Sequence, residues 1–372
     1  MMTEEKTAST SSSDGADAVT ILDWTEIAAS ETSADLLAKL EHALGPNGIG
    51  LVAIRNVPDF VSTKQSFLPQ AHQLVHLPSD YLESALTDPS SLYNAGWSHG
   101  KEKLGDKPDT AKGSFYYNPV TDLPGTEQDR HKYPYSYPLN KWPTEKMPDF
   151  QDEAKRMGMI LKQATVHLAK HIDALAASKC HDYPEQFLYQ KMKDTDKVKA
   201  RLLYYFPQEA QQVSEDSWIG WHNDSGFLTA LGGDLYVNHE TGEPMECPDP
   251  DAGLYVADRQ QQARKIDLPA DCCAVQIGEC TQIVTGGAVR ATPHCVRGAK
   301  APNVARISLP CFVDTPPYQV LAVPPSASRE EVLESAANST KVPPLGPRWT
   351  GNDMTFGEFL QRTFSMYYDW KP

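Results

Sequence analysis

The residues best suited to chemistry lie in the segment GWHNDSGFLTAL, residues 220–231. This segment holds His222 and Asp224, separated by one residue. On an extended chain, residues i and i+2 point to the same side, so an imidazole and a carboxylate can converge on one metal ion. A second imidazole from another strand would complete a set of two histidines and one carboxylate. That set suits nonheme Fe(II), because it leaves coordination positions open for a co-substrate and O₂.

A second His-x-Asp triplet, from His171 to Asp173, lies in a stretch with helical periodicity. In an α-helix, residues i and i+2 lie about 200° apart around the axis, so these two side chains cannot bind one ion together. We therefore expect a structural role for this pair, with His171 partly buried and Asp173 exposed. For His222 and Asp224, the alternative to a metal site is a polar turn.

Downstream segments offer a second imidazole and a receptor for an anion. His294 occupies a strand-like position in the segment ATPHCVRG. Arg306 and Ser308 share one face of the apolar run ARISLPCF. A guanidinium in such a strand needs an anionic partner, and its forked donors suit a carboxylate. That carboxylate can belong to a ligand or to an acidic side chain of the chain itself.

The elements that must position these residues follow from the apolar pattern. Short strands separated by Gly, Pro and Asp favour a sandwich or barrel between residues 200 and 313. Apolar residues spaced by three and four predict one long amphipathic helix over 148–178. The expected strands are RLLYYF, FLTAL, GLYVA, CAVQIG, TQIVTG and ARISLPCF, preceded by strands at 19–24 and 49–54. Further helices are expected near 33–44, 61–77, 328–336 and 354–367.

Composition limits the classes of partner. The net charge is −15, from 34 basic and 49 acidic residues, which argues against nucleic acid or an anionic membrane as the main partner. No apolar run is long enough to span a bilayer, and no secretory signal is apparent. The seven cysteines form no CxxC pair and are interpreted as reduced thiols. We expect a cytoplasmic protein with a small-molecule substrate and no obligate protein partner.

Taken together, these motifs resemble a known family. HxD followed by Gly and Leu-Thr, then Thr-Pro-His, then Arg-x-Ser, resembles the iron(II)/2-oxoglutarate-dependent dioxygenases of the isopenicillin N synthase-like branch. The runs ILDW, GIGLVAIRNVPDF and RLLYYFP extend the resemblance over roughly residues 19–368. It implies a mainly β fold with flanking helices and a double-stranded β-helix (jelly roll, cupin-like) core. The implied organisation is a disordered tail (1–18), an N-terminal α/β module (19–145) and the oxygenase domain (146–372).

The resemblance also implies roles for individual residues. Its cofactors are Fe(II), 2-oxoglutarate as co-substrate, and O₂. The implied iron ligands are His222, Asp224 and His294, and the implied 2-oxoglutarate residues are Arg306, Ser308 and Tyr205. The sequence departs from the family at Leu203, where Asn is common, and in two long spacings. We place the extra residues in a turn at 298–303 and in a surface loop near 233–251.

The implied activity is oxidation of a small organic molecule, by hydroxylation or desaturation, with release of succinate and CO₂. Retention of Asp224 argues for an oxygenase over a halogenase. Two alternatives stay open: an oxidase like isopenicillin N synthase or ACC oxidase that does not consume 2-oxoglutarate, and a non-catalytic binding protein on this scaffold. Candidate substrate contacts, each of which can equally be a core aromatic, are Tyr93, Trp97, Phe115, Tyr117, Trp218 and Phe312.

Overall fold

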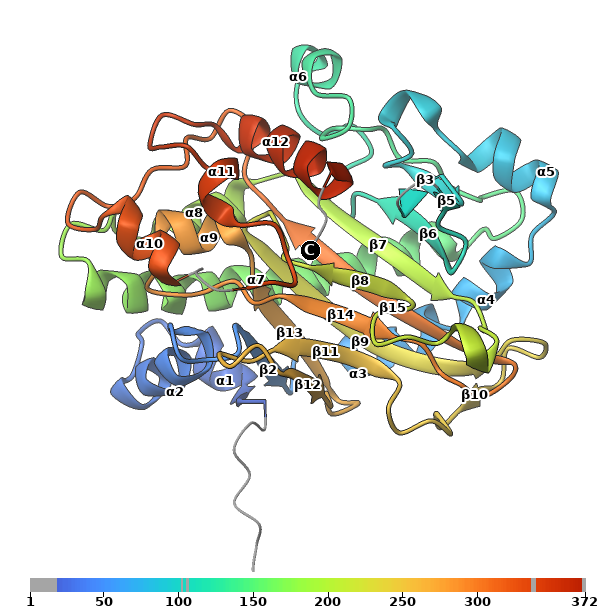
Figure 1. Cartoon of the computed structure of the whole chain (residues 1–372). Helices are drawn as coiled ribbons and strands as arrows, with labels where there is room; N and C mark the ends of the chain where they lie inside the picture. Colours follow the sequence, from blue (N-terminus) through green and yellow to red (C-terminus); the bar gives the residue numbers. More distant parts are fainter. Residues whose placement is uncertain (1–18, 102, 105–106, 336–338, 370–372) are drawn as a thin grey trace, which may run out of the picture.

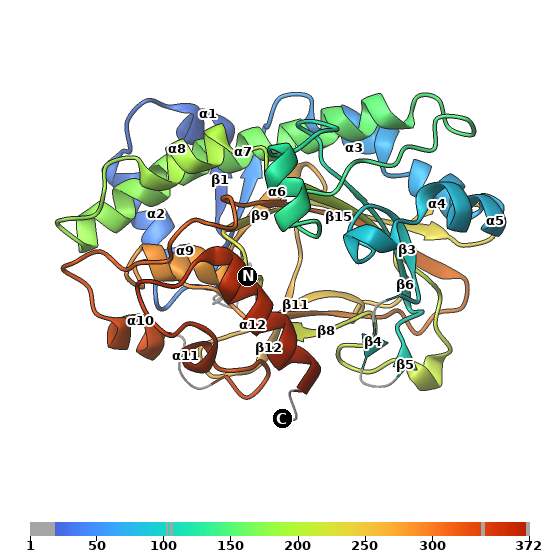
Figure 2. The same cartoon turned by 90° about the horizontal axis from the view of Figure 1, so that it is seen from above.

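The computed structural model describes residues 19–101, 103–104, 107–335 and 339–369. The predicted disordered tail, residues 1–18, lies outside this part of the chain. Within it, a larger and a smaller β-sheet lie face to face, and a long helix runs along the outer face of the larger sheet (Figures 1 and 2). The prediction of a jelly-roll core with flanking helices is confirmed.

The larger sheet contains nine strands, joined along the path β1-β2-β13-β9-β15-β7-β6-β3. Its pairings are antiparallel, except that β1 and β2 are parallel. Strands from residues 19–145 therefore hydrogen-bond directly to strands that follow residue 146. The bounds are β1 (Ile21–Asp23), β2 (Leu51–Arg55), β3 (Gly96–His99), β6 (Lys112–Tyr117), β7 (Val198–Tyr205), β9 (Leu228–Asn238), β13 (Cys272–Ile277) and β15 (Val304–Val313), with β10 (Pro244–Met245) beside β9.

The smaller sheet has the order β12-β11-β14-β8 and is antiparallel. Its bounds are β8 (Ile219–His222), β11 (Gly253–Ala257), β12 (Ala263–Ile266) and β14 (His294–Arg297). A separate two-stranded ladder joins β4 (Lys103–Leu104) to β5 (Lys107–Pro108). Side chains of the nine-stranded sheet and of the four-stranded sheet line one cavity between these two sheets.

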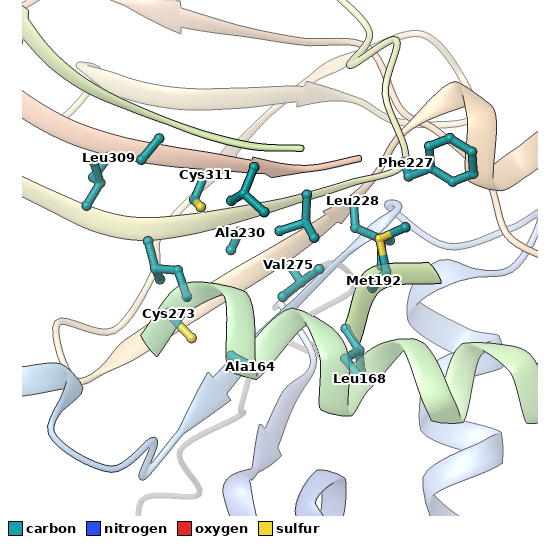
Figure 3. Close-up of a cluster of buried hydrophobic side chains, with 14 of the residues drawn as sticks. Ala164, Leu168, Met192, Phe227, Leu228, Ala230, Cys273, Val275, Leu309 and Cys311 are labelled. Carbon is teal, nitrogen blue, oxygen red and sulfur yellow. The ribbon is translucent and has the colours of Figure 1, made fainter. Parts of the chain in front are cut away.

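Helix α7 (Phe150–Lys179) agrees closely with the predicted long helix. Its apolar stripe packs on the outer face of the larger sheet, where Figure 3 shows Ala164 and Leu168 beside residues such as Val275 and Cys311. Full burial of a leucine or valine side chain contributes about 1.5–3 kcal/mol to the free energy of unfolding. This layer makes the larger sheet a firm support for residues on its inner face.

The remaining helices lie around the two sheets. The helix predicted at 61–77 is divided in two, because Pro69 has no N–H with which to continue the hydrogen-bond ladder. The helices are α1 (Trp24–Ala28), α2 (Ala34–Leu44), α3 (Phe60–Phe67), α4 (Gln70–Val75), α5 (Ser79–Tyr81), α6 (Glu127–Lys132), α8 (Phe187–Asp194), α9 (Glu279–Val284), α10 (Arg329–Ser335), α11 (Leu345–Arg348) and α12 (Phe356–Asp369). Single helical turns occur at η1 (Leu82–Leu86), η2 (Pro89–Ser91) and η3 (Ala210–Gln212).

Two predictions for the β region are wrong. The run TQIVTG was expected as a strand, but most of it lies in helix α9. Tertiary hydrogen bonds override the β propensity of its Thr, Ile and Val residues. The N–H groups of Glu279 and Cys280 donate to the carbonyls of Asp224 (2.8 Å) and Gly226 (3.0 Å), which ties the start of the helix to the preceding loop.

The prediction of a surface loop near 233–251 is also wrong for its first residues, 233–238, which belong to strand β9. Strand β9 continues through Gly232 and Gly233 to Asn238 and pairs with β15 over this length. A Cβ at Gly232 would lie 3.2 Å from the Cβ of Leu309, so this glycine permits close strand packing and does not mark a loop. The extension places Asp234 opposite Ser308.

No helix in the described ranges combines the length and the apolar character needed to cross a bilayer. All seven cysteines fall within these ranges and are free thiols.

Candidate metal centre and co-substrate pocket

A cavity between the two sheets contains the predicted metal and co-substrate residues. Its water-accessible volume is about 100 Å³. Polar and ionisable groups on its wall come from β7, β9, β13 and β15 of the larger sheet and from β8, β14 and the loop after β8, and aliphatic side chains of both sheets surround them. The polar members are Arg201, Tyr205, His222, Asp224, Thr229, Asp234, Gln276, His294, Arg306 and Ser308.

The three predicted metal ligands converge at one place in this cavity. His222 ends β8, His294 begins the neighbouring β14, and the two are register partners. Asp224 follows two residues after His222. One potential ligand atom from each residue lies within 4.8 Å of the other two, and His294 Nε2 is 3.9 Å from Asp224 Oδ1. The strand pairing therefore brings together groups that are 72 residues apart in the chain (294 − 222).

Hydrogen bonds orient both imidazoles toward a metal. Nδ1 of His222 lies 2.8 Å from the carbonyl of Gly220, and Nδ1 of His294 lies 3.2 Å from the carbonyl of Thr292. A carbonyl can only accept, so each Nδ1 carries a proton, and in the neutral tautomer that this defines Nε2 has the lone pair available for a metal. Such contacts to the far ring nitrogen are typical of metal-bound histidines.

Gln276 provides a further contact to the same ring. Its side-chain nitrogen is placed 2.6 Å from Nδ1 of His294, while its buried carbonyl oxygen Oε1 has no hydrogen-bond partner in the part of the chain that the structure describes. Rotating the amide by 180° exchanges these two atoms, which are interchangeable on structural grounds alone. Gln276 Oε1 then accepts from the protonated Nδ1, and the unpartnered oxygen is satisfied.

The electrostatics also fit a metal centre. Burial lowers the pKa of His222 to about 4, with a further lowering from His294. His222 is therefore neutral at physiological pH, as a metal ligand must be. Asp224 is only 8% exposed and supplies the negative charge. Two imidazoles and one carboxylate on one face of a cavity are the ligand set of nonheme Fe(II) centres, so the residues present fit this metal.

Arg306 lines the same cavity from β15 and is 6% exposed. Its Nε donates to Asp234 Oδ2 at 2.9 Å, so the chain itself supplies one anionic partner. Its Nη1 is buried and has no hydrogen-bond partner among the described residues. Burial alone would lower the pKa of Arg306, but the Asp234 carboxylate outweighs this effect and the pKa is raised. The guanidinium is therefore charged and retains a donor for a second acceptor.

The other two predicted co-substrate residues lie in the same cavity wall. The ring of Tyr205 is centred 5.2 Å from Arg306 Cζ, and Ser308 lies two residues further along β15. Both line the cavity. The same wall contains Arg201, whose Nε donates to Ser114 Oγ at 3.0 Å and whose guanidinium lies over the ring of Tyr116 at 5.0 Å.

The six candidate substrate residues occupy different places. Phe312 lines the cavity. Trp218 is buried outside the cavity lining: its ring centroid lies 5.3 Å from that of Tyr205, and its Nε1 donates to the carbonyl of Phe206. Three further aromatics, Trp97, Phe115 and Tyr117, belong to the main hydrophobic core, and Tyr93 lies beside Lys101. Of the six, only Phe312 contributes to the cavity wall.

The second His-x-Asp triplet lies in α7, away from the cavity. His171 is fully buried and contacts the carbonyl of Ile27 (2.9 Å) and the hydroxyl of Thr32 (2.8 Å). The prediction that Asp173 is exposed is wrong, because it is only 4% exposed. Its carboxylate accepts from Tyr183 and from two N–H groups in the first turn of α8, and thereby caps that helix from outside.

Sequence reasoning missed several residues of this site. Arg201 could have been found, because it precedes Leu203 and Tyr205 at the period of two that defines one face of a strand. Gln276 and Asp234 gave no comparable signal, because their roles depend on which strands become neighbours. The pairing of β13 with β9 and of β9 with β15 supplies that information.

Neither a protein-family model nor a curated protein sequence matches this chain. Solved structures do match. A protein from Caulobacter crescentus assigned to the 2OG-Fe(II) oxygenase family has a TM-score of 0.66 at 18% identity, over 94% of this chain and 99% of that chain.

Two further structures agree with this result. T7H from Neurospora crassa, solved with alpha-KG (2-oxoglutarate) and thymine, has a TM-score of 0.63 at 17% identity, over 94% of this chain and 97% of that chain. A rice dioxygenase for auxin oxidation, DAO, has a TM-score of 0.57 at 16% identity, over 94% of this chain and 96% of that chain. The likeness covers nearly the whole of each chain, so this protein has the fold of the 2OG-Fe(II) oxygenases.

Proposed function

We propose that this protein is an Fe(II)- and 2-oxoglutarate-dependent dioxygenase that hydroxylates or desaturates a small organic molecule. The observation that carries the proposal is the content of a single cavity. It holds a two-histidine, one-carboxylate cluster together with a buried, charged arginine, one of whose donors has no partner within the described ranges. The fold in which this cavity lies is that of known 2OG-Fe(II) oxygenases.

The roles of the residues follow from their positions. His222, Asp224 and His294 would hold the iron, which supplies the oxidising chemistry when bound with 2-oxoglutarate and O₂. Arg306 would bind the distal carboxylate of 2-oxoglutarate through Nη1, and the hydroxyl of Ser308 would donate to the same group. Tyr205 packs against the guanidinium and limits its orientation. The aliphatic wall keeps water from the reacting atoms.

The substrate class rests on size and surroundings. The cavity is small and largely apolar, which suits a small organic molecule that has an exposed C–H bond. T7H was solved with thymine and JOX2 with JA, and both structures share this fold. We place Phe312 at the substrate side of the cavity. Membership of the isopenicillin N synthase-like branch and the cytoplasmic location remain part of this proposal.

A screen of small metabolites tests the function. The purified protein would be incubated aerobically with Fe(II), 2-oxoglutarate and each metabolite, and succinate and product mass would be followed. A true substrate gains one oxygen atom or loses two hydrogen atoms for each succinate formed. Product formation without succinate would instead support the oxidase alternative. Asp224→Ala, which removes the carboxylate ligand, is the matched negative control.

A further inference from the structure

A buried ion pair outside the cavity joins Glu279 to Arg348. Glu279 opens α9 and Arg348 ends α11, and they are 1% and 0% exposed. The guanidinium forms two parallel hydrogen bonds, Nη1 to Oε2 and Nη2 to Oε1, each 2.5 Å long. Burying two charges costs several kcal/mol per ion, and well-packed apolar residues often serve stability as well. The pair therefore calls for a role beyond general stability.

On one side, the ion pair organises the C-terminal part of the chain. Besides Glu279, Arg348 donates to the carbonyls of Pro343 (3.0 Å) and Pro344 (3.2 Å) and to the hydroxyl of Thr363 (3.3 Å) in α12. All five N–H donors of this guanidinium thus have an acceptor. The arginine joins α11, the segment before it, and α12, which gather at the same side of the molecule (Figures 1 and 2).

On the other side, Glu279 holds the loop that carries the metal ligands. Its Oε1 accepts from the side-chain amide of Asn223 at 2.9 Å, and Asn223 lies between His222 and Asp224. Its backbone N–H donates to the carbonyl of Asp224 at 2.8 Å. Glu279 therefore binds two successive residues of this loop, once through its side chain and once through its backbone.

We propose that Glu279 and Arg348 are positioning residues for the metal centre, which couple docking of the C-terminal segment (residues 343–366) to metal affinity. The ion pair orients the carboxylate of Glu279, Glu279 fixes Asn223, and this fixes the direction in which Asp224 points. Because coupling between two sites is reciprocal, metal binding must also stabilise the docked segment. The inference rests on the proposed function only in taking His222, Asp224 and His294 as metal ligands.

Arg329 provides a matched control for Arg348. It also binds the C-terminal segment, donating to the carbonyls of Gly346 (2.9 Å) and Trp349 (3.0 Å), and its guanidinium lies over the ring of Trp349. Its hydrogen bonds in the described residues reach only these two carbonyls, and none reaches the loop at 223–227. A purely structural effect of disturbing this segment should therefore appear equally in both arginine variants.

The experiment measures Co(II) affinity of the full-length protein by competition with a chromophoric chelator, together with the melting temperature of each metal-free variant. We expect Asn223→Ala, Glu279→Gln and Arg348→Lys to weaken Co(II) binding roughly 10- to 100-fold, as for other residues that orient metal ligands. Arg329→Lys leaves the Arg348–Glu279–Asn223 contacts to the metal loop in place, so it should lower the melting temperature while leaving Co(II) affinity within about twofold of wild type. If Glu279→Gln and Arg348→Lys do not fold, the Co(II) affinity of Asn223→Ala tests the proposal, because this substitution leaves the ion pair in place.

Amide hydrogen exchange tests the reciprocal effect. Co(II) should slow exchange in residues 343–366 of the wild type, and this protection should be largely lost in Asn223→Ala. Unchanged Co(II) affinity in all three variants, with only lower melting temperatures, would show that the ion pair is structural and would overturn the proposal. A wild type that binds neither Co(II) nor Fe(II) would instead overturn the metal assignment itself, and the positioning role with it.

Discussion

Substitution of Arg306 is the sharpest test of how the pocket recognises 2-oxoglutarate. Arg306→Leu removes the guanidinium from a site where it is 6% exposed and already paired through Nε with Asp234. Loss of a buried, charge-assisted pair costs about 2–5 kcal/mol of binding free energy. At 25 °C this corresponds to roughly a thirty-fold to several-thousand-fold weaker affinity. Arg306→Lys should fall between wild type and Leu, because an ammonium keeps the charge but lacks the fork that serves two carboxylates at once.

The assay is succinate release at varied 2-oxoglutarate concentration, with Fe(II) affinity measured in parallel. The apparent KM for 2-oxoglutarate should rise by the factors above, while Fe(II) affinity stays close to wild type, because Arg306 is not a metal ligand. Asp234→Asn serves as control: its amide oxygen can still accept from Nε, so its KM should change far less than that of the Leu variant. A folded, iron-loaded Arg306→Leu protein with a KM within about twofold of wild type would refute the assigned role.

Three further predictions concern the metal loop and the second triplet. Asp224→Ala should abolish turnover and weaken Fe(II) binding, measured by anaerobic titration; full retention of iron would contradict its role as ligand. His171→Ala should leave the iron content unchanged but lower the free energy of unfolding by about 1–3 kcal/mol, since it leaves the Ile27 carbonyl unsatisfied; loss of iron would reverse our assignment. Gly226→Ala should lower the melting temperature and Fe(II) affinity together, because its Cβ would lie 2.2 Å from Oδ1 of the buried Asp314; wild-type values would show that the loop adapts.

The spacing of apolar residues along the sequence was sufficient to predict several elements of the core. The apolar periodicity of 148–178 predicts α7 to within a few residues, because a helix of this length shows its buried stripe many times over. The alternation in ARISLPCF likewise indicates β15 and places Arg306 and Ser308 on one face. The two His-x-Asp triplets could be separated by the same argument, since only one of them lies on an extended chain.

Tertiary contacts decide what the local pattern could not. Helix α9 has the composition of a strand, but its first N–H groups bond to the carbonyls of the metal loop. An aspartate in a long amphipathic helix is usually expected to face solvent. Asp173 instead caps a helix that begins 14 residues later (187 − 173). The Gly, Asn, Asp and Pro residues of 233–251 predict a loop that would include Asp234, whereas β9 continues through this position and packs closely on β15 at Gly232. The module boundary at 145/146 and the roles of the site residues remain predictions.

The central claim, that one cavity binds Fe(II) and 2-oxoglutarate together, is tested most directly by anaerobic titration of the Fe(II)-loaded protein with 2-oxoglutarate. Chelation of the metal by the keto acid gives a metal-to-ligand charge-transfer absorption. We predict that this absorption appears in the wild type, saturates at one 2-oxoglutarate per chain, and requires much higher concentrations in Arg306→Leu. A wild type that binds one Fe(II) but shows neither this absorption nor 2-oxoglutarate binding would contradict the account, and Arg306 would then be assigned to a carboxylate of the substrate.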